Sequence, residues 1–266
     1  MSSKHLKYDQ VGNSSQTVVL LHGFCENRTM WRHIVPALAA QHQVINIDLG
    51  GFGESADMLP VAVNIDTLAA QVLDLLQHLG IGACVVLGHS LGGYVALAMA
   101  EQSPDLLQGV GLVHSSALPD SKPRQAMRDR ILSIVRQRGV APFAHHFVQN
   151  LFLAERLPEL NNAIKEAQAM ALSTPKQSLI EVTLAMRNRP DRCEVLKKLT
   201  CPVLFLIGKQ DPAIPMGQYL SQITLPQDAH VHLLDHTAHM GTWERPDKTR
   251  LILLNFVIYC FAQNSL

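Results

Sequence analysis

The sequence predicts an α/β fold in which a doubly wound, mostly parallel sheet carries an all-helical insertion. Strand-length apolar runs alternate with segments of helical spacing through residues 1–117 and again through residues 193–266, as in βαβ units. The run Ala83–Leu87 is apolar throughout, as expected for a strand that is covered on both faces. Residues 118–192 contain helical patterns only. We therefore expect a core built from 1–117 and 193–266, and a helical cap over 118–192.

The individual elements can be predicted in chain order. Apolar residues recur at helical spacing over Asp66–Leu79, and Gly80 ends that helix. After Ala83–Leu87, strands are expected at Gly109–Val113, Val203–Ile207 and Val231–Leu234. In the cap, helices are expected at Pro123–Arg138, Ala141–Leu153, Pro158–Leu172 and Lys176–Arg187. The apolar stretch Leu251–Phe261 is too short to span a bilayer and predicts a buried C-terminal helix.

The segment Gly88-His89-Ser90-Leu91-Gly92 lies between a strand pattern and a helix pattern. A serine in such a setting occupies a sharp, strained turn, so small residues such as Gly88 and Gly92 must flank it. The turn presents the hydroxyl at the positive end of the next helix, where it can attack a carbonyl carbon. Ser90 is therefore the predicted nucleophile, and His89 is expected to pack against the scaffold. The alternative is a Gly-rich turn in which Ser90 only caps the helix.

A serine nucleophile needs a base, and the base needs an acid that orients it. Asp211 follows the strand-like run Val203–Ile207, and His239 follows the strand-like run Val231–Leu234. Both lie past the carboxyl ends of predicted strands, where open α/β sheets place their sites. The order Ser90, Asp211, His239 completes a predicted catalytic triad.

These motifs resemble the α/β-hydrolase superfamily in its compact form with a helical cap. The resemblance rests on Leu21-His22-Gly23-Phe24, on Asp48–Ser55, on the turn at Ser90, and on the loops of Asp211 and His239. It spans nearly the whole chain outside the cap, and it is specific for the superfamily rather than for one activity. A serine at the turn argues against epoxide hydrolases and haloalkane dehalogenases, which use a carboxylate nucleophile.

The resemblance also implies roles for further residues. An oxyanion hole would be formed by the backbone N–H groups of Phe24 and Leu91. Gly23 would let its loop come close to the substrate oxygen, and His22 would tie that loop to its neighbours. The Asp48–Ser55 segment is expected to be structural.

Other titratable residues lie close to the predicted triad. His236 remains an alternative base, but His239 is preferred because the segment after it begins the last helix, as in the family. Asp235 is expected to be a surface carboxylate. Some relatives place the acid after the strand at Gly109–Val113, where the first carboxylate of this chain is Asp120.

Composition narrows the class of protein. The 266 residues carry no formal net charge, and the sequence pI is near 7.2, which argues against nucleic-acid binding. Five cysteines without metal-binding spacing favour the cytoplasm. The N-terminal segment Met1–Lys7 has no apolar h-region, so we expect no signal peptide, and we expect no membrane partner. Monomer and dimer both remain open.

The cap should control access to the site. Residues 121–192 contain twelve Lys or Arg against six Asp or Glu, which could favour an anionic substrate or could reflect solvated helix faces. Six apolar side chains are candidates for a pocket under the cap: Phe143, Phe147, Phe152, Met127, Met170 and Met186. The pair His145-His146 lacks the spacing of a metal site, so we expect neither metal nor cofactor.

The expected reaction is hydrolysis of a small or medium carboxylic ester, a small-molecule acyl substrate, through an acyl-enzyme intermediate. Three alternatives remain open because fold likeness does not determine activity. The same triad could hydrolyse a carbon–carbon bond next to a ketone, or eliminate a carboxylate. It could act as a perhydrolase or haloperoxidase. The chain could also be a ligand receptor or signalling protein with little turnover.

Overall fold

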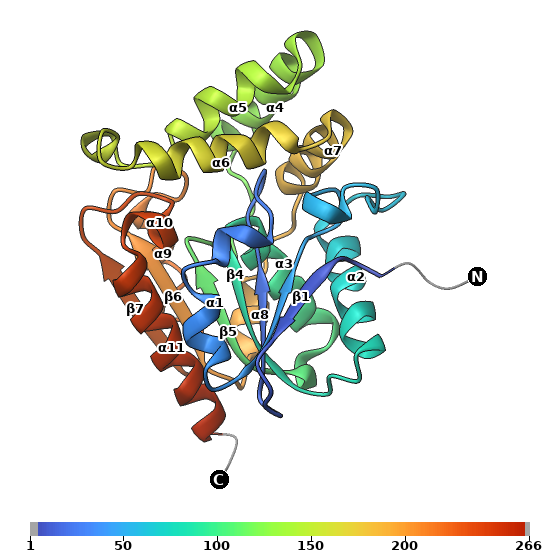
Figure 1. Ribbon diagram of the computed structural model, residues 1–266, viewed down its shortest axis with the longest axis vertical. Coiled ribbons are helices and arrows are strands. Elements are labelled where there is room, and N and C mark those ends of the chain that lie inside the picture. Colours follow the sequence, from blue (N-terminus) through green and yellow to red (C-terminus); the bar gives the residue numbers. More distant parts are fainter. Residues whose placement is uncertain (1–4, 264–266) are drawn as a thin grey trace.

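The computed structural model describes residues 5–263, so the first four residues of the Met1–Lys7 segment lie outside the described part. Figure 1 shows a central sheet with helices on both sides and a helical layer above it. The strand order is β1-β3-β2-β4-β5-β6-β7, with β1 antiparallel to β3 and the other neighbours parallel. The strands are β1 (Tyr8–Val11), β2 (Thr17–Leu21), β3 (Gln43–Ile47), β4 (Cys84–His89), β5 (Leu107–Val113), β6 (Val203–Gly208) and β7 (Ala229–Leu234).

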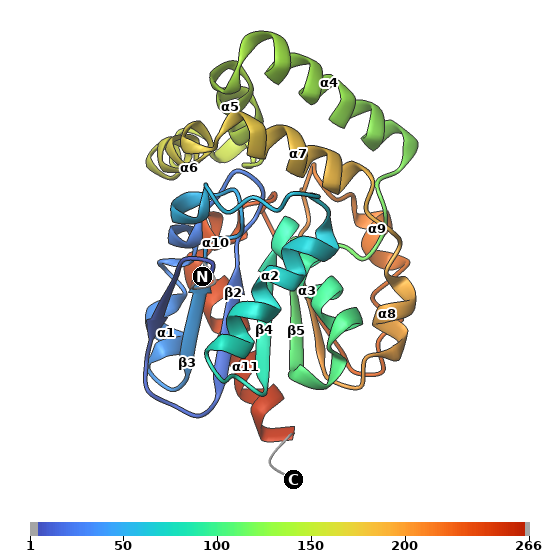
Figure 2. The ribbon, with the colours of Figure 1, turned by 90° about the vertical axis from the view of Figure 1, so that its right-hand side faces the viewer.

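Helices cover both faces of this sheet, as a doubly wound fold requires. In Figures 1 and 2, α2, α3 and α8 lie on one face, and α1 and α11 lie on the other. The core helices are α1 (Val35–Ala39), α2 (Ile65–His78), α3 (Leu91–Gln102), α8 (Cys193–Lys198), α9 (Met216–Leu220), α10 (Gly241–Glu244) and α11 (Pro246–Gln263). Short 3₁₀ turns are η1 (Arg28–Trp31), η2 (Gly53–Ser55), η3 (Pro104–Leu106) and η4 (Ala154–Arg156). The predicted fold class is confirmed.

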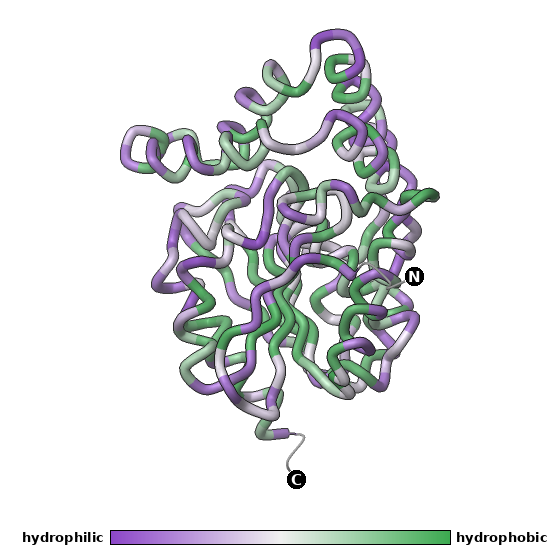
Figure 3. Tube along the Cα trace, turned by 45° about the vertical axis from the view of Figure 1, so that its right-hand side comes forward, coloured by the Kyte–Doolittle hydropathy of each residue, from purple (hydrophilic) through white to green (hydrophobic). Residues whose placement is uncertain are grey.

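The parallel strands are buried because helices cover both of their faces. Every residue of β2, β4 and β6 is buried, and the strands at the middle of the sheet are the most hydrophobic part of the tube in Figure 3. The helix predicted before β4 is present as α2. Asn64 begins it through a capping box with Thr67, and Gly80 follows it with a φ of 69°.

The predicted insertion between β5 and β6 is helical, and it lies over the carboxyl ends of the strands (Figure 2). Helix α4 packs against both α5 and α7, and α5 also packs against α6. The helices are α4 (Lys122–Arg138), α5 (Val140–Gln149), α6 (Asn161–Ser173) and α7 (Lys176–Arg187). That residues 118–192 form a separate cap domain remains a prediction.

The C-terminal helix differs from its prediction. Leu253, Val257 and Cys260 of α11 are buried, but Leu251 and Ile258 are 58% and 41% exposed. The helix therefore covers the sheet with one face only. No helix in the described residues is long and apolar enough to cross a membrane.

Candidate active site

Ser90 occupies a strained turn between β4 and α3. Its φ of 48° and ψ of −110° are unusual for a residue with a side chain. A Cβ added to Gly88 would lie 2.3 Å from the backbone of Gly92, and one added to Gly92 would lie 2.3 Å from the carbonyl oxygen of Leu21. Glycine is therefore needed on both sides of the serine for a steric reason.

Neighbouring segments hold the Ser90 backbone in this conformation. Its N–H donates to the carbonyl of Val113 at 3.0 Å, and the Ser115 hydroxyl donates to the Ser90 carbonyl at 2.7 Å. The residue itself is partly exposed, whereas the helix that follows it is buried from Leu91 to Ala100. The turn thus leaves Ser90 accessible at the positive end of α3.

Asp211 and His239 lie side by side although 28 residues separate them in the chain. His239 Nδ1 is 2.8 Å from Asp211 Oδ2, while the N–H groups of Ala213 and Ile214 donate to Oδ1 at 2.7 and 3.1 Å. Burial alone would raise the pKa of Asp211, but the adjacent His239 and His114 rings hold that pKa well below its usual range. The ionised carboxylate accepts the Nδ1 proton and leaves His239 Nε2 free to act as a base.

A further imidazole faces the same carboxylate, and no sequence pattern had indicated a role for it. His114 follows β5 with a φ of 48°, and its Nδ1 is 3.6 Å from Asp211 Oδ2. The ring is fully buried and neither nitrogen has a hydrogen-bond partner. Burial lowers the pKa of His114 to about 4, so the ring is neutral at neutral pH.

The predicted oxyanion loop is joined to the serine turn by a buried ion pair. Glu26 Oε2 accepts the N–H of Gly23 at 2.6 Å and lies 2.9 Å from His89 Nδ1. His89 Nε2 is 3.0 Å from the carbonyl oxygen of His239. Because both ring nitrogens face acceptors, His89 must carry two protons to satisfy them. Burial disfavours that charge, but Glu26 raises the pKa of His89 above its usual value.

His89 and Gly23 make contacts in this region that no sequence pattern indicates. His89 does face the scaffold, but it does so as one member of an ion pair that joins the serine turn to the oxyanion loop and to the His239 loop. Gly23 makes room for this pair, since a Cβ there would lie 2.6 Å from His89 Nδ1 and 2.7 Å from Glu26 Oε2. Phe24 is 5% exposed, and Leu91, as the first residue of α3, has an N–H without an acceptor inside the helix.

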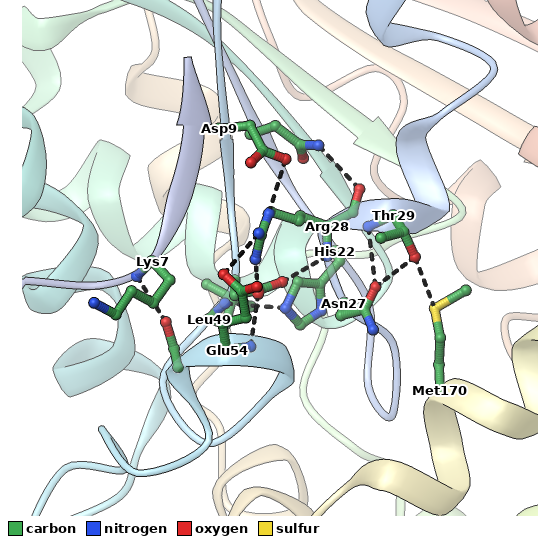
Figure 4. Close-up of polar contacts among 12 residues, drawn as sticks. Lys7, Asp9, His22, Asn27, Arg28, Thr29, Leu49, Glu54 and Met170 are labelled. Atoms are coloured by element: carbon green, nitrogen blue, oxygen red, sulfur yellow. Dashed lines mark hydrogen bonds and ion pairs between the residues drawn. The ribbon is translucent and has the colours of Figure 1, made fainter.

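His22 and the segment after β3 have the structural contacts expected of them. His22 Nδ1 donates to the carbonyl of Gly23 at 2.8 Å, and its Nε2 accepts the N–H of Leu49 at 3.0 Å (Figure 4). Arg28 pairs with Asp48, which also accepts the N–H of Glu54 at 2.8 Å. These bonds tie the oxyanion loop to the Asp48–Ser55 segment.

Glu244 holds the His239 loop from the other side. Its buried carboxylate accepts the N–H groups of Ala238, Met240 and Leu153 at 3.0, 3.1 and 2.9 Å. Leu153 precedes η4, so this carboxylate joins the His239 loop to the helical insertion. From the sequence, the segment that contains Glu244 was expected to begin the last helix. In the structure Glu244 is instead the last residue of α10, and α11 begins at Pro246.

The residues considered as alternative acids and bases are either exposed or paired with basic side chains. Asp235 is exposed and pairs with Lys209 at 2.6 Å, and His236 is exposed at the turn beside it. Asp120 is buried, but it is held by two guanidinium groups, those of Arg128 and Arg189. These contacts favour Asp211 and His239 as the acid and base.

Three of the six predicted pocket residues line one groove between α4 and α5, namely Met127, Phe143 and Phe147. The rings of Phe143 and Phe147 lie 6.4 and 5.8 Å from that of Phe24. The structure places the other three elsewhere, in packing contacts. Phe152 stacks on Trp243 at 6.0 Å, Met170 accepts the Thr29 hydroxyl at 3.7 Å (Figure 4), and Met186 is buried in α7.

One group of residues in the described part of the chain has the donor atoms of a metal site. Ligand atoms of His114, Asp211 and His239 lie within 4.8 Å of one another. The His239 proton already occupies Oδ2 of Asp211, and two backbone N–H groups occupy Oδ1. This hydrogen bonding accounts for the carboxylate without a metal. The buried thiol of Cys25 is equally poor as a ligand or nucleophile, because burial raises its pKa.

Comparison with known proteins agrees with this geometry. Residues 16–246 match the model of the α/β hydrolase fold family. The chain belongs to the α/β hydrolase fold family. Its structure superposes on that of a thermophilic esterase from Thermogutta terrifontis, solved with malate bound, with a TM-score of 0.89 and 29% identity; the match covers 96% of this chain and 93% of the other.

Curated relatives differ in activity. A putative carbamate hydrolase, RutD, of Stutzerimonas stutzeri is 29% identical, with 90% of each chain covered. A 2-hydroxy-6-oxononadienedioate/2-hydroxy-6-oxononatrienedioate hydrolase of Dechloromonas aromatica is 23% identical, with 96% of this chain and 91% of the relative covered. Proteins with this fold therefore act on different substrates, and the choice of substrate depends on the details of each site.

Proposed function

We propose that this α/β hydrolase is a carboxylic-ester hydrolase with Ser90 as nucleophile, His239 as base and Asp211 as the orienting acid. The observation that carries the proposal is the 2.8 Å contact between His239 Nδ1 and Asp211 Oδ2. The serine is held in a strained turn, and its neighbour His89 contacts the carbonyl oxygen of His239. The 29% identity to the Thermogutta esterase supports the same class.

In this mechanism His239 Nε2 takes the Ser90 proton as Oγ attacks the ester carbonyl. The N–H groups of Phe24 and Leu91 stabilise the oxyanion of the tetrahedral intermediate. His239 then protonates the leaving alcohol, which departs and leaves the acyl group on Ser90. Water repeats the sequence with His239 as base, which releases the acid and restores the serine. Asp211 stays ionised and stabilises the imidazolium that forms in each half-reaction.

The experiment is hydrolysis of p-nitrophenyl esters from acetate to laurate by the wild type and by Ser90→Ala. The proposal predicts activity that Ser90→Ala abolishes, with a preferred chain length set by the space beneath the helical insertion. Wild-type protein that hydrolyses none of the esters and resists a fluorophosphonate probe would contradict it.

Hydrolysis of a carbon–carbon bond next to a ketone is the second candidate. It is favoured by the arginines that line the groove beside the Asp211 loop, because such substrates are acidic. Cleavage of a vinylogous keto acid in the absence of esterase activity would favour it over the ester reaction.

A further inference from the structure

A groove of about 400 Å³ runs between α4 and α5 and ends beside the loop of Asp211. Its apolar lining comes from both helices. Met127 and Ile134 on α4 are 47% and 40% exposed, which is unusual for side chains of this size. The residues that line it include no aspartate or glutamate. Its large apolar side chains are those of Met127, Ile131, Ile134, Phe143, Phe147 and Leu151.

The inner end of the groove adjoins the candidate active site at three points. Pro212 and Ala213, which line it, directly follow Asp211. The carbonyl of Leu151 accepts the N–H of His239 at 2.9 Å. The rings of Phe143 and Phe147 pack on Phe24 of the oxyanion loop. A chain bound in the groove would therefore run toward the loops that carry Phe24, Asp211 and His239.

The groove also carries positive charge that no ion pair among the described residues neutralises. Arg128 donates to Asp120 at 3.0 Å, but Arg124, Arg130 and Arg138 form no ion pair with any described residue. Positions 124, 128, 131, 134 and 138 fall on one face of α4 because of their helical spacing, so cations flank the apolar strip. A guanidinium group matches the geometry of a carboxylate, and a partly apolar setting strengthens the attraction.

We propose that this groove binds a carboxylate-terminated hydrocarbon chain, so that the substrate is an ester whose acyl chain ends in a second, ionised carboxyl group. The ester carbonyl lies at Ser90, the methylene groups lie on Phe143 and Phe147, and the free carboxylate lies against the arginines of α4. The placement of the ester rests on the proposed function; the binding of the carboxylate chain does not.

The kinetic test compares mono-p-nitrophenyl adipate with p-nitrophenyl hexanoate, which has the same number of acyl carbons but no charge. The wild type should prefer the adipate ester, and added salt should reduce that preference. Arg124→Gln and Arg138→Gln should each lower kcat/KM for the adipate ester by a larger factor than for the hexanoate ester. The loss should reach about tenfold at the arginine that bonds the carboxylate. Arg136→Gln is the matched control, since Arg136 is an exposed arginine of the same helix outside the groove. Equal loss for both esters, or an equal effect of Arg136→Gln, would overturn the proposal.

A binding measurement separates this proposal from the proposed function. Calorimetric titration of Ser90→Ala with adipate, suberate and sebacate needs no hydrolysis. Binding that Arg124→Gln or Arg138→Gln weakens, together with a wild type that hydrolyses none of the esters, would uphold the groove and reject the ester reaction. No binding of any dicarboxylate would overturn the groove assignment. Co-sedimentation with phosphatidylglycerol vesicles that needs the same arginines, without dicarboxylate binding, would also overturn it and make α4 and α5 a membrane-facing surface.

Discussion

Asp211 is the residue on which the geometry of the candidate site depends most. Both of its oxygens are occupied, Oδ1 by two backbone N–H groups and Oδ2 by the His239 ring. The carboxylate therefore cannot rotate without breaking buried hydrogen bonds, and its orientation determines which nitrogen of His239 carries the proton.

Replacing this carboxylate by an amide should preserve the fold and impair the reaction. In Asp211→Asn the side chain can donate to His239 and favour the wrong tautomer, so we expect kcat to fall by about three to four orders of magnitude. Steady-state kinetics on a p-nitrophenyl ester measures the loss. Asp235→Asn, at an exposed carboxylate, is the control. Near-normal turnover of Asp211→Asn would move the acid to another residue.

Some residues of the candidate site could be predicted from the sequence, and others could not. Asp211 and His239 follow strands, so chain order and the fold place them together. Glu26 and His114 have no such local signal. Glu26 meets His89 across 63 positions in the chain, and His114 faces Asp211 only because β5 and β6 are neighbours in the sheet. Contacts of this kind depend on tertiary packing and not on a sequence pattern.

Among the elements, the close approach of β4 to α3 is the most demanding. Gly88→Ala would place a Cβ 2.3 Å from the backbone of Gly92, and no flexible side chain is there to move aside. We expect a loss of about 1–3 kcal/mol in the free energy of unfolding, together with lower esterase activity. Urea denaturation measures the change in the free energy of unfolding.

The matched control for this substitution is Gly82→Ala, just before β4. A Cβ at Gly82 meets nothing within 4 Å, so the free energy of unfolding should change by less than about 0.5 kcal/mol. If the two variants were equally stable, the steric account of the serine turn would be wrong.

The sequence pattern predicted the positions of the helices in the insertion well. It did not predict which residues these helices contact in the folded protein. Helix α7 has the predicted bounds, whereas α5 ends at Gln149, before the predicted Leu153. Leu153 is instead extended, and its N–H donates to Glu244 in the core. Helical periodicity shows which side chains are apolar, but it does not show whether they face a groove, as Phe143 does, or a packed neighbour, as Phe152 does.

For the molecule as a whole, buried imidazoles make stability depend on pH. His114 is held neutral by burial, and its pKa is about 4 in the folded chain against 6.5 for the free group. As pH falls below about 6.5 the unfolded chain binds a proton that the folded chain does not. Stability is therefore lost as pH falls toward about 4, with His114 contributing on the order of 3 kcal/mol.

This pH dependence can be measured by thermal unfolding of the wild type and of His114→Asn between these two pH values. The variant should lose less stability than the wild type on acidification, because its side chain does not titrate. His145→Asn, on the exposed side of α5, serves as the control and should follow the wild type. Parallel curves for the wild type and His114→Asn would contradict the assignment of a buried neutral ring.

Trapping the acyl-enzyme tests most directly whether Ser90 is the nucleophile. Wild-type protein mixed with p-nitrophenyl acetate, quenched in acid within the first turnover and digested, should yield an acetylated peptide with the label on Ser90 by mass spectrometry. Ser90→Ala should yield none. A label on another residue during steady hydrolysis, or hydrolysis that persists in Ser90→Ala, would contradict the account of Ser90 as the nucleophile.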